Sequence, residues 1–186
     1  MVEGDESARV AGVAGRGLGL VILLALTWKV LAAGLTLPGG GALGFLHGIN
    51  LVFHEAGHVI FGFFGEFVAV LGGSLNQVLI PTIALGAFLR TRQRASAAVA
   101  LFWAGQSLTD VAIYAADGRA RALPLLAEGL IHDWNYILGR LGLLGSAEIV
   151  GRLLFAVGAL VMLAAILLLA LDLLRCLNTP PRREAA

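Results

Sequence analysis

The sequence predicts an all-α integral membrane protein with about five hydrophobic segments, and its composition is the first reason. Of 186 residues, 59% are hydrophobic and 13% are charged, whereas average soluble domains have about 45–50% apolar and about 25% charged residues. The run over residues 153–171 has no charge and is long enough to cross a hydrocarbon core of about 30 Å as a helix. Because only short connections separate the apolar runs, we expect one membrane-embedded domain over residues 1–186.

Charge and cysteine content exclude two further classes of site. The net charge is +1, and the arginines form no basic face with interleaved aromatic residues, so nucleic acid is not an expected partner. The single cysteine, Cys176, excludes an internal disulfide bond and a zinc site built from several cysteines.

The first expected helix covers residues 17–37 and follows a short polar tail over 1–16. Its only internal charge is Lys29, and the sequence PGGG at 38–41 should end it, because proline and glycine do not continue a helix. Acidic residues in the tail, Lys29 and the apolar segments downstream favour a retained helix over a cleaved secretory signal.

The second and third segments begin the expected core, residues 43–135. The second, about 43–64, carries His47, Asn50 and the sequence FHEAGH. The third, about 67–89, contains GGSLNQ at 72–77, which we expect to interrupt the helix and line a cavity, because irregular backbone in a membrane needs such surroundings. A full crossing divides the arginines between both sides of the membrane, whereas a re-entrant segment puts both termini and RTRQR on one positive side; both topologies stay open.

The fourth segment, about 95–116, holds Gln106, Ser107 and Asp110. The longest connection without apolar character follows, at about 117–146, and includes IHDWNYILGR. The C-terminal helix is expected over 150–173, before a short polar tail over 176–186.

The sequence FHEAGH places His54, Glu55 and His58 in a pattern that binds metal. Helical residues four apart share one face, so both imidazoles can reach one ion with Glu55 beside them. Two neutral imidazoles suit Zn²⁺, which in hydrolytic sites takes a third protein ligand and one water. Zinc lowers the pKa of that water, and a neighbouring glutamate can pass its proton to the leaving amine, so Glu55 is the expected general base. Without metal, ionisable side chains at the bilayer centre would each cost about 2.5–3.5 kcal/mol.

The third ligand must come from elsewhere in the chain. Asp110 is the favoured candidate, because it is a carboxylate inside an apolar helix at a depth that matches His58 in parallel segments. His132 is the alternative, with Asp133 either orienting it or capping the following helix. His47 lies seven residues before His54, about 10 Å along the axis, so we expect it to line the cavity instead.

Three amide side chains are candidates for contact with a substrate or for support of the site. Asn76, Gln77 and Gln106 could hold an extended substrate backbone or stabilise an oxyanion. Hydrogen bonding between membrane helices is the equally open alternative for all three.

The sequence HEAGH inside a hydrophobic helix, the later GGSLNQ and an intramembrane aspartate resemble the site-2 protease family of intramembrane zinc metalloproteases. The resemblance covers residues 43–117, and its specific part is the H-E-x-x-H pattern. It implies that His54, His58 and Asp110 bind zinc and that Glu55 is the general base. Asp110 stands in GQSLTDV rather than in the family's Leu-Asp-Gly setting, and the sequence HDW has no counterpart there.

The function predicted from these observations is intramembrane proteolysis by a zinc metalloprotease in a bacterial inner (plasma) membrane. The expected partners are the lipid bilayer and a transmembrane or juxtamembrane peptide substrate; the oligomeric state is left open. Two alternatives also stay open. One is a zinc-dependent hydrolase of a lipid amide or ester, and the other is a non-catalytic metal-binding membrane protein.

Overall fold

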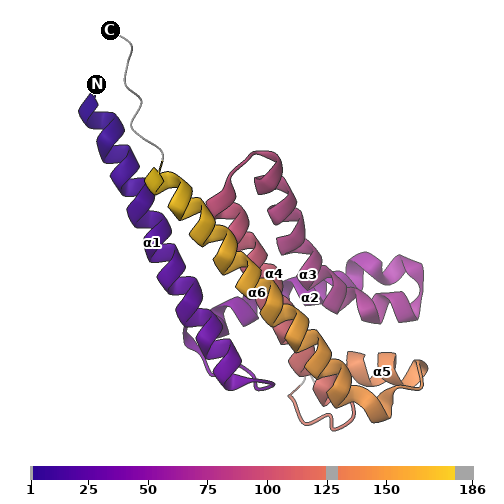
Figure 1. Cartoon of the computed structure of the whole chain (residues 1–186). Helices are drawn as coiled ribbons and strands as arrows, with labels where there is room; N and C mark the ends of the chain where they lie inside the picture. Colours follow the sequence, from indigo (N-terminus) through magenta and orange to yellow (C-terminus); the bar gives the residue numbers. More distant parts are fainter. Residues whose placement is uncertain (1, 125–129, 179–186) are drawn as a thin grey trace.

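The computed structural model describes residues 2–124 and 130–178, and every regular element in these ranges is a helix, which confirms the all-α prediction. The elements are α1 (Val2–Ala33), α2 (Gly41–Phe61), the 3-10 turn η1 (Gly62–Phe64), α3 (Glu66–Arg90), α4 (Arg94–Asp117), α5 (Asp133–Arg140), the 3-10 turn η2 (Leu144–Ser146) and α6 (Ala147–Asn178) (Figure 1).

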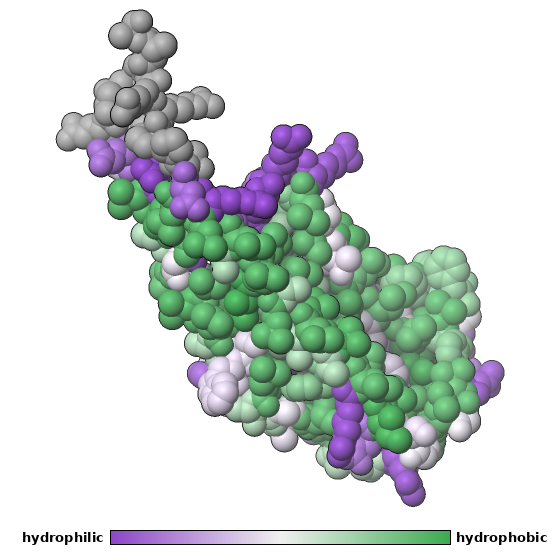
Figure 2. All heavy atoms as spheres, viewed as in Figure 1, coloured by the Kyte–Doolittle hydropathy of each residue, from purple (hydrophilic) through white to green (hydrophobic). Residues whose placement is uncertain are grey.

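Four helical stretches are long and apolar enough to cross a membrane. They are Glu6–Ala33, Glu66–Arg90, Arg94–Asp117 and Leu144–Asn178. Figure 2 shows a broad apolar surface over the long helices, with hydrophilic residues gathered toward the two ends. Soluble monomers rarely expose so much contiguous apolar surface, so the chain is a membrane protein.

The expected second membrane segment, α2, is not among these four stretches, and it runs across the direction of the long helices (Figure 1). The start of α1, the turn between α3 and α4, and the end of α6 lie toward the same end of the bundle (Figure 1). This is the arrangement expected if one hydrophobic segment fails to cross. By length and composition, the expected segment 67–89 is among the four stretches, as Glu66–Arg90, and α2 is not; whether either segment spans or re-enters stays a prediction.

The sequence GGSLNQ does not interrupt α3, which is one continuous helix through this sequence and through Pro81. The expected irregular backbone was therefore wrong, and packing explains the glycines instead. A Cβ atom at Gly72 would lie 2.8 Å from the carbonyl oxygen of Gly57 in α2, and one at Gly57 would collide with the carbonyl oxygen of Gly72. Glycine at both positions lets the two helix backbones approach closely, as small residues do between membrane helices.

The terminal helices extend beyond their expected bounds into the polar tails. α1 begins at Val2 and not near residue 17, because the tail contains good helix formers, and it ends at Ala33, just before Gly34 with φ +61°. α6 covers Ala147–Asn178 and so includes the start of the expected tail over 176–186. The remainder of that tail, residues 179–186, lies outside the described residues.

The helix α4 is the centre of the molecule and packs against α3 on one side and α6 on the other. Close α4–α6 contact occurs where Gly105 and Gly158 meet, because a Cβ atom on either would lie within 2.8 Å of the other's carbonyl oxygen. An apolar cluster joins α3 and α4 to the short helix α5 through Val70, Val111 and Trp134. This cluster fixes α5 next to the polar face of α2, where the candidate site lies.

Candidate metal centre

The two histidines of FHEAGH share one face of α2, as predicted. Their rings lie edge to face with centroids 4.8 Å apart. The opposite wall is Gly73 of α3, where a Cβ atom would lie 2.6 Å from Nε2 of His54 and 2.7 Å from Nε2 of His58. Glycine at position 73 therefore leaves the space that both imidazoles occupy.

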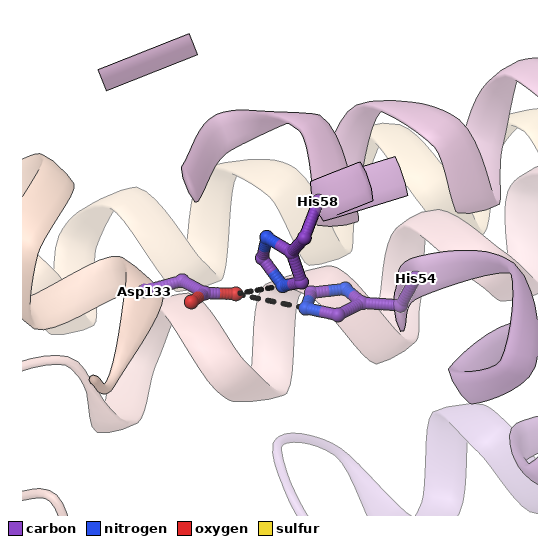
Figure 3. A group of neighbouring side chains, drawn as sticks. All are labelled: His54, His58 and Asp133. Carbon is purple, nitrogen blue, oxygen red and sulfur yellow. Dashed lines mark hydrogen bonds and ion pairs between the residues drawn. The ribbon is translucent and has the colours of Figure 1, made fainter. Parts of the chain in front are cut away.

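Asp133 completes a group of three ligand atoms with these histidines. Its Oδ2 lies 2.8 Å from Nε2 of His54 and 3.3 Å from Nε2 of His58 (Figure 3), and the ligand atoms of the group all lie within 4.8 Å of one another. A tetrahedral ion with ligand distances of about 2.0–2.1 Å holds neighbouring ligand atoms about 3.3–3.4 Å apart. The distance from His58 Nε2 already matches this spacing, and the distance from His54 Nε2 is about 0.5 Å short of it.

Each imidazole is held through Nδ1, which leaves Nε2 for an ion. His54 Nδ1 donates to Oε1 of Gln77 at 2.8 Å, and His58 Nδ1 donates to the carbonyl oxygen of Ala69 at 2.9 Å. The Gln77 amide is oriented by its own Nε2, which donates to the carbonyl oxygen and Oγ of Ser107 at 3.1 and 3.3 Å. Because both acceptors are oxygens, both Nδ1 atoms carry a proton, and both Nε2 atoms face the Asp133 carboxylate. Each Nε2 can donate to that carboxylate when it is protonated, and it offers a lone pair to an ion when it is not.

Three electron-pair donors that face one point repel each other unless a cation lies between them, either a proton or a metal ion. Burial alone would raise the pKa of the Asp133 carboxyl, but its hydrogen bonds with His54 and His58 outweigh burial and hold the pKa below its ordinary value. The same environment favours the carboxylate form of Asp133, which is the form that a metal ion would bind.

Asp110, the favoured third ligand, is not brought to the two histidines. Its Oδ2 accepts from Nδ2 of Asn50 at 2.8 Å, its Oδ1 accepts from Nε2 of Gln106 at 3.0 Å, and Nδ1 of His47 lies 3.3 Å from Oδ2. These donors from α2 and α4 satisfy the carboxylate where it lies. Among the described residues, the group that could hold a metal ion with His54 and His58 therefore contains Asp133 and not Asp110, the ligand expected from the sequence.

His132, the alternative ligand, points toward the end of α4 instead of the metal centre. Its Nε2 lies 3.0 Å from Oδ2 of Asp117, and its Nδ1 accepts the N–H of Asn135 at 3.3 Å as the N-cap of α5. The expected roles are thus reversed, because His132 anchors the start of α5 while Asp133 offers the ligand atom.

Two more contacts set the position of Asp133. The indole Nε1 of Trp134 donates to Oγ of Ser74 in α3 at 3.0 Å, and the backbone N–H of Asp133 donates to the hydroxyl of Tyr114 in α4 at 3.2 Å. The sequence HDW therefore attaches one residue to α4, presents the next to α2, and attaches the third to α3.

The predicted amide residues divide between two roles. Gln77 supports the metal centre through His54, whereas Asn76 donates to the carbonyl oxygen of Phe53 at 2.7 Å and Gln106 lies in the Asp110 cluster. Gln106 also accepts from Nδ2 of Asn50 in α2 at 2.9 Å, so Asn76 and Gln106 both make the interhelical hydrogen bonds that were the alternative to substrate contact.

The metal centre lies on the wall of a cavity of about 640 Å³. Glu55 and Tyr114 line the same cavity beside the three residues of that centre, and so do His47 of α2 and Asp110 of α4. The remaining lining is mostly apolar; it includes Leu37, Leu51, Val70, Val111, Leu123, Pro124, Leu130 and Ile131. Sequence reasoning missed Tyr114, although its position four residues after Asp110 puts both on one face of α4.

Comparisons with known proteins give no match to this chain among protein-family models, curated proteins or solved structures.

The first prediction separates the two aspartates. Asp133→Ala should reduce bound zinc from about one equivalent to a small fraction, because two imidazoles alone do not hold the ion. Asp110→Ala should retain zinc, although the α2–α4 contact is weakened. Elemental analysis of the purified proteins and chelator competition measure both. Zinc loss in Asp110→Ala with retention in Asp133→Ala would reverse the assignment.

The second prediction tests the space opposite the histidines. Gly73→Ala should lower zinc affinity at least about tenfold, because the new methyl group displaces both Nε2 atoms from the position that binds the ion. Gly86→Ala in the same helix is the matched control, since a Cβ atom there meets no atom within 4 Å. Equal zinc affinity in the two variants, measured by chelator competition, would contradict the geometry.

Proposed function

We propose that the protein is a membrane-embedded zinc metallopeptidase that hydrolyses a peptide bond in or near the membrane. The observation that carries the proposal is the convergence of His54 Nε2, His58 Nε2 and the Asp133 carboxylate, with Glu55 on the wall of the same cavity. Its expected location, a bacterial inner (plasma) membrane, stays a prediction.

The donor set fits zinc. Two neutral imidazoles and one carboxylate are a known ligand combination for catalytic zinc, and three protein ligands leave a position for water. Bound zinc would lower the pKa of that water and polarise the substrate carbonyl. The same donor set also binds Fe²⁺, so elemental analysis is the first experiment on the purified protein.

The chain's own residues would divide the remaining tasks. Glu55 takes one proton as the water oxygen bonds to the carbonyl carbon, and it returns that proton to the nitrogen when the C–N bond breaks. Gln77 and the carbonyl of Ala69 keep the imidazoles in one tautomer throughout. The contacts of Trp134 and His132 hold the carboxylate of Asp133 in place.

The apolar lining of the cavity favours a substrate with apolar side chains. A helical substrate would have to unwind, because its backbone hydrogen bonds otherwise keep the scissile carbonyl from the metal centre. The cavity lining includes Leu37, Leu130 and Ile131, all exposed, so an apolar chain would meet apolar surface there.

The same lining favours a second candidate, a zinc-dependent hydrolase of a lipid amide or ester. An acyl chain fits an apolar cavity as well as a peptide side chain does, and the reacting carbonyl would occupy the same place. Quenched-fluorescent transmembrane peptides and N-acyl or ester lipids, each incubated with and without chelator, would distinguish the two substrates.

The third prediction tests Glu55 as the base. Glu55→Gln should retain about one equivalent of zinc and lose about 10²–10⁴-fold in turnover, because glutamine cannot take the proton. The measurement is cleavage by protein in lipid nanodiscs together with elemental analysis. Glu66→Gln, at the start of α3, is a control that should keep wild-type activity.

Two results would contradict this division of roles. Loss of zinc from Glu55→Gln would make Glu55 part of the ligand set. Full turnover with zinc in place would show that Glu55 does not act as the base, and full cellular function without detectable turnover would favour the non-catalytic metal-binding alternative.

A further inference from the structure

The side chain of Tyr114 lies in the cavity wall next to the metal centre, on α4. Its hydroxyl oxygen accepts the backbone N–H of Asp133 at 3.2 Å, and its ring centroid lies 6.0 Å from that of His54. The Tyr114 hydroxyl is thus hydrogen-bonded to the backbone of the same residue whose side chain offers the ligand atom Oδ2. Tyr114 also lines the same cavity as Glu55.

Among the described residues, the hydroxyl proton of Tyr114 has no hydrogen-bond acceptor. The N–H of Asp133 occupies one lone pair, and over residues 2–124 and 130–178 no carbonyl or side chain accepts the proton. A phenol can donate one hydrogen bond in addition to accepting. In an apolar cavity such a donor is worth more than in water, because water does not compete for it.

We propose that the Tyr114 hydroxyl donates a hydrogen bond to the substrate carbonyl oxygen as negative charge develops on it. This inference rests on the proposed hydrolase function and adds the donor that the ligand residues and Glu55 do not supply. The water oxygen bonds to the carbonyl carbon, the C=O π electrons move to the oxygen, and the hydroxyl of Tyr114 stabilises that oxygen without giving up its proton. Its backbone partner at Asp133 holds the hydroxyl in place beforehand, so little reorganisation is needed at the moment of reaction.

The fourth prediction follows from this role. Tyr114→Phe should retain zinc and lower kcat about 10²–10³-fold, the usual effect of removing one oxyanion donor, with KM nearly unchanged. Tyr136→Phe is the matched control, since Tyr136 packs against Phe67 and Arg140 away from the cavity, and it should keep wild-type kcat. The substrate in both assays is the quenched-fluorescent transmembrane peptide cleaved by the wild type.

A binding measurement provides a readout that does not depend on turnover. A phosphinic peptide carries tetrahedral oxygens where the reacting carbonyl would be, and transition-state analogues lose affinity along with transition-state stabilisation. Tyr114→Phe should bind the phosphinic peptide at least about tenfold more weakly, and the unmodified peptide equally well.

The outcomes separate this inference from the proposed function. Equal affinity of wild type and Tyr114→Phe for the phosphinic peptide would overturn the donor role, and so would loss of zinc, which would make Tyr114 a positioning residue for Asp133. Absence of chelator-sensitive hydrolysis by the wild type would overturn the proposed function, while the binding comparison would still decide the role of Tyr114.

Discussion

The structure depends on one electrostatic constraint, which is that two imidazole Nε2 atoms and a buried carboxylate face the same point. Gln77 and the carbonyl of Ala69 fix the tautomers, so neither ring can relieve the repulsion by exchanging its nitrogens. A cation at that point makes the arrangement favourable, either a proton on Nε2 that pairs with the Asp133 carboxylate or a metal ion, because a carboxylate without a partner in apolar surroundings is costly. The helices around this point therefore bring together two imidazoles and a carboxylate that stabilise one another only when a cation is shared between them.

Three glycines and the helix α5 bring these groups together. Gly57 and Gly72 let α2 and α3 approach backbone to backbone, and Gly73 leaves the volume in which both imidazoles lie. The short helix α5 then brings Asp133 from a distant part of the sequence, and Trp134 limits its movement through Ser74. An isolated helix of this length would be marginal in water, so its position is set by these tertiary contacts.

Local patterns in the sequence were enough to predict the all-α fold and the two histidines of the candidate metal centre. The spacing of His54 and His58 is a property of a single helix and needs no tertiary information. Asp133 was ranked behind Asp110 and His132, as a residue that orients His132 or caps a helix, because its approach to the histidines depends on the path of the connection before α5. Asp110 was favoured as an uncompensated charge in an apolar helix, but its donors, among them Asn50, come from another helix. The glycines of GGSLNQ were taken as helix breakers, since sequence alone does not show a neighbouring backbone.

The polar face of α2 consists of two groups with different tasks, and this explains why so many polar residues interrupt one apolar run. Toward its start, Asn50 joins Gln106 and Asp110 and accepts from the indole of Trp103 at 2.8 Å. Hydrogen bonds between membrane helices contribute about 0.6–2 kcal/mol each, so several of them can fix the rotation of a helix that lies across the bundle. With that rotation fixed, the histidines one to two turns further along must face α3 and α5. The buried aspartate once expected to bind the metal thus holds α2 in the orientation that the metal centre requires.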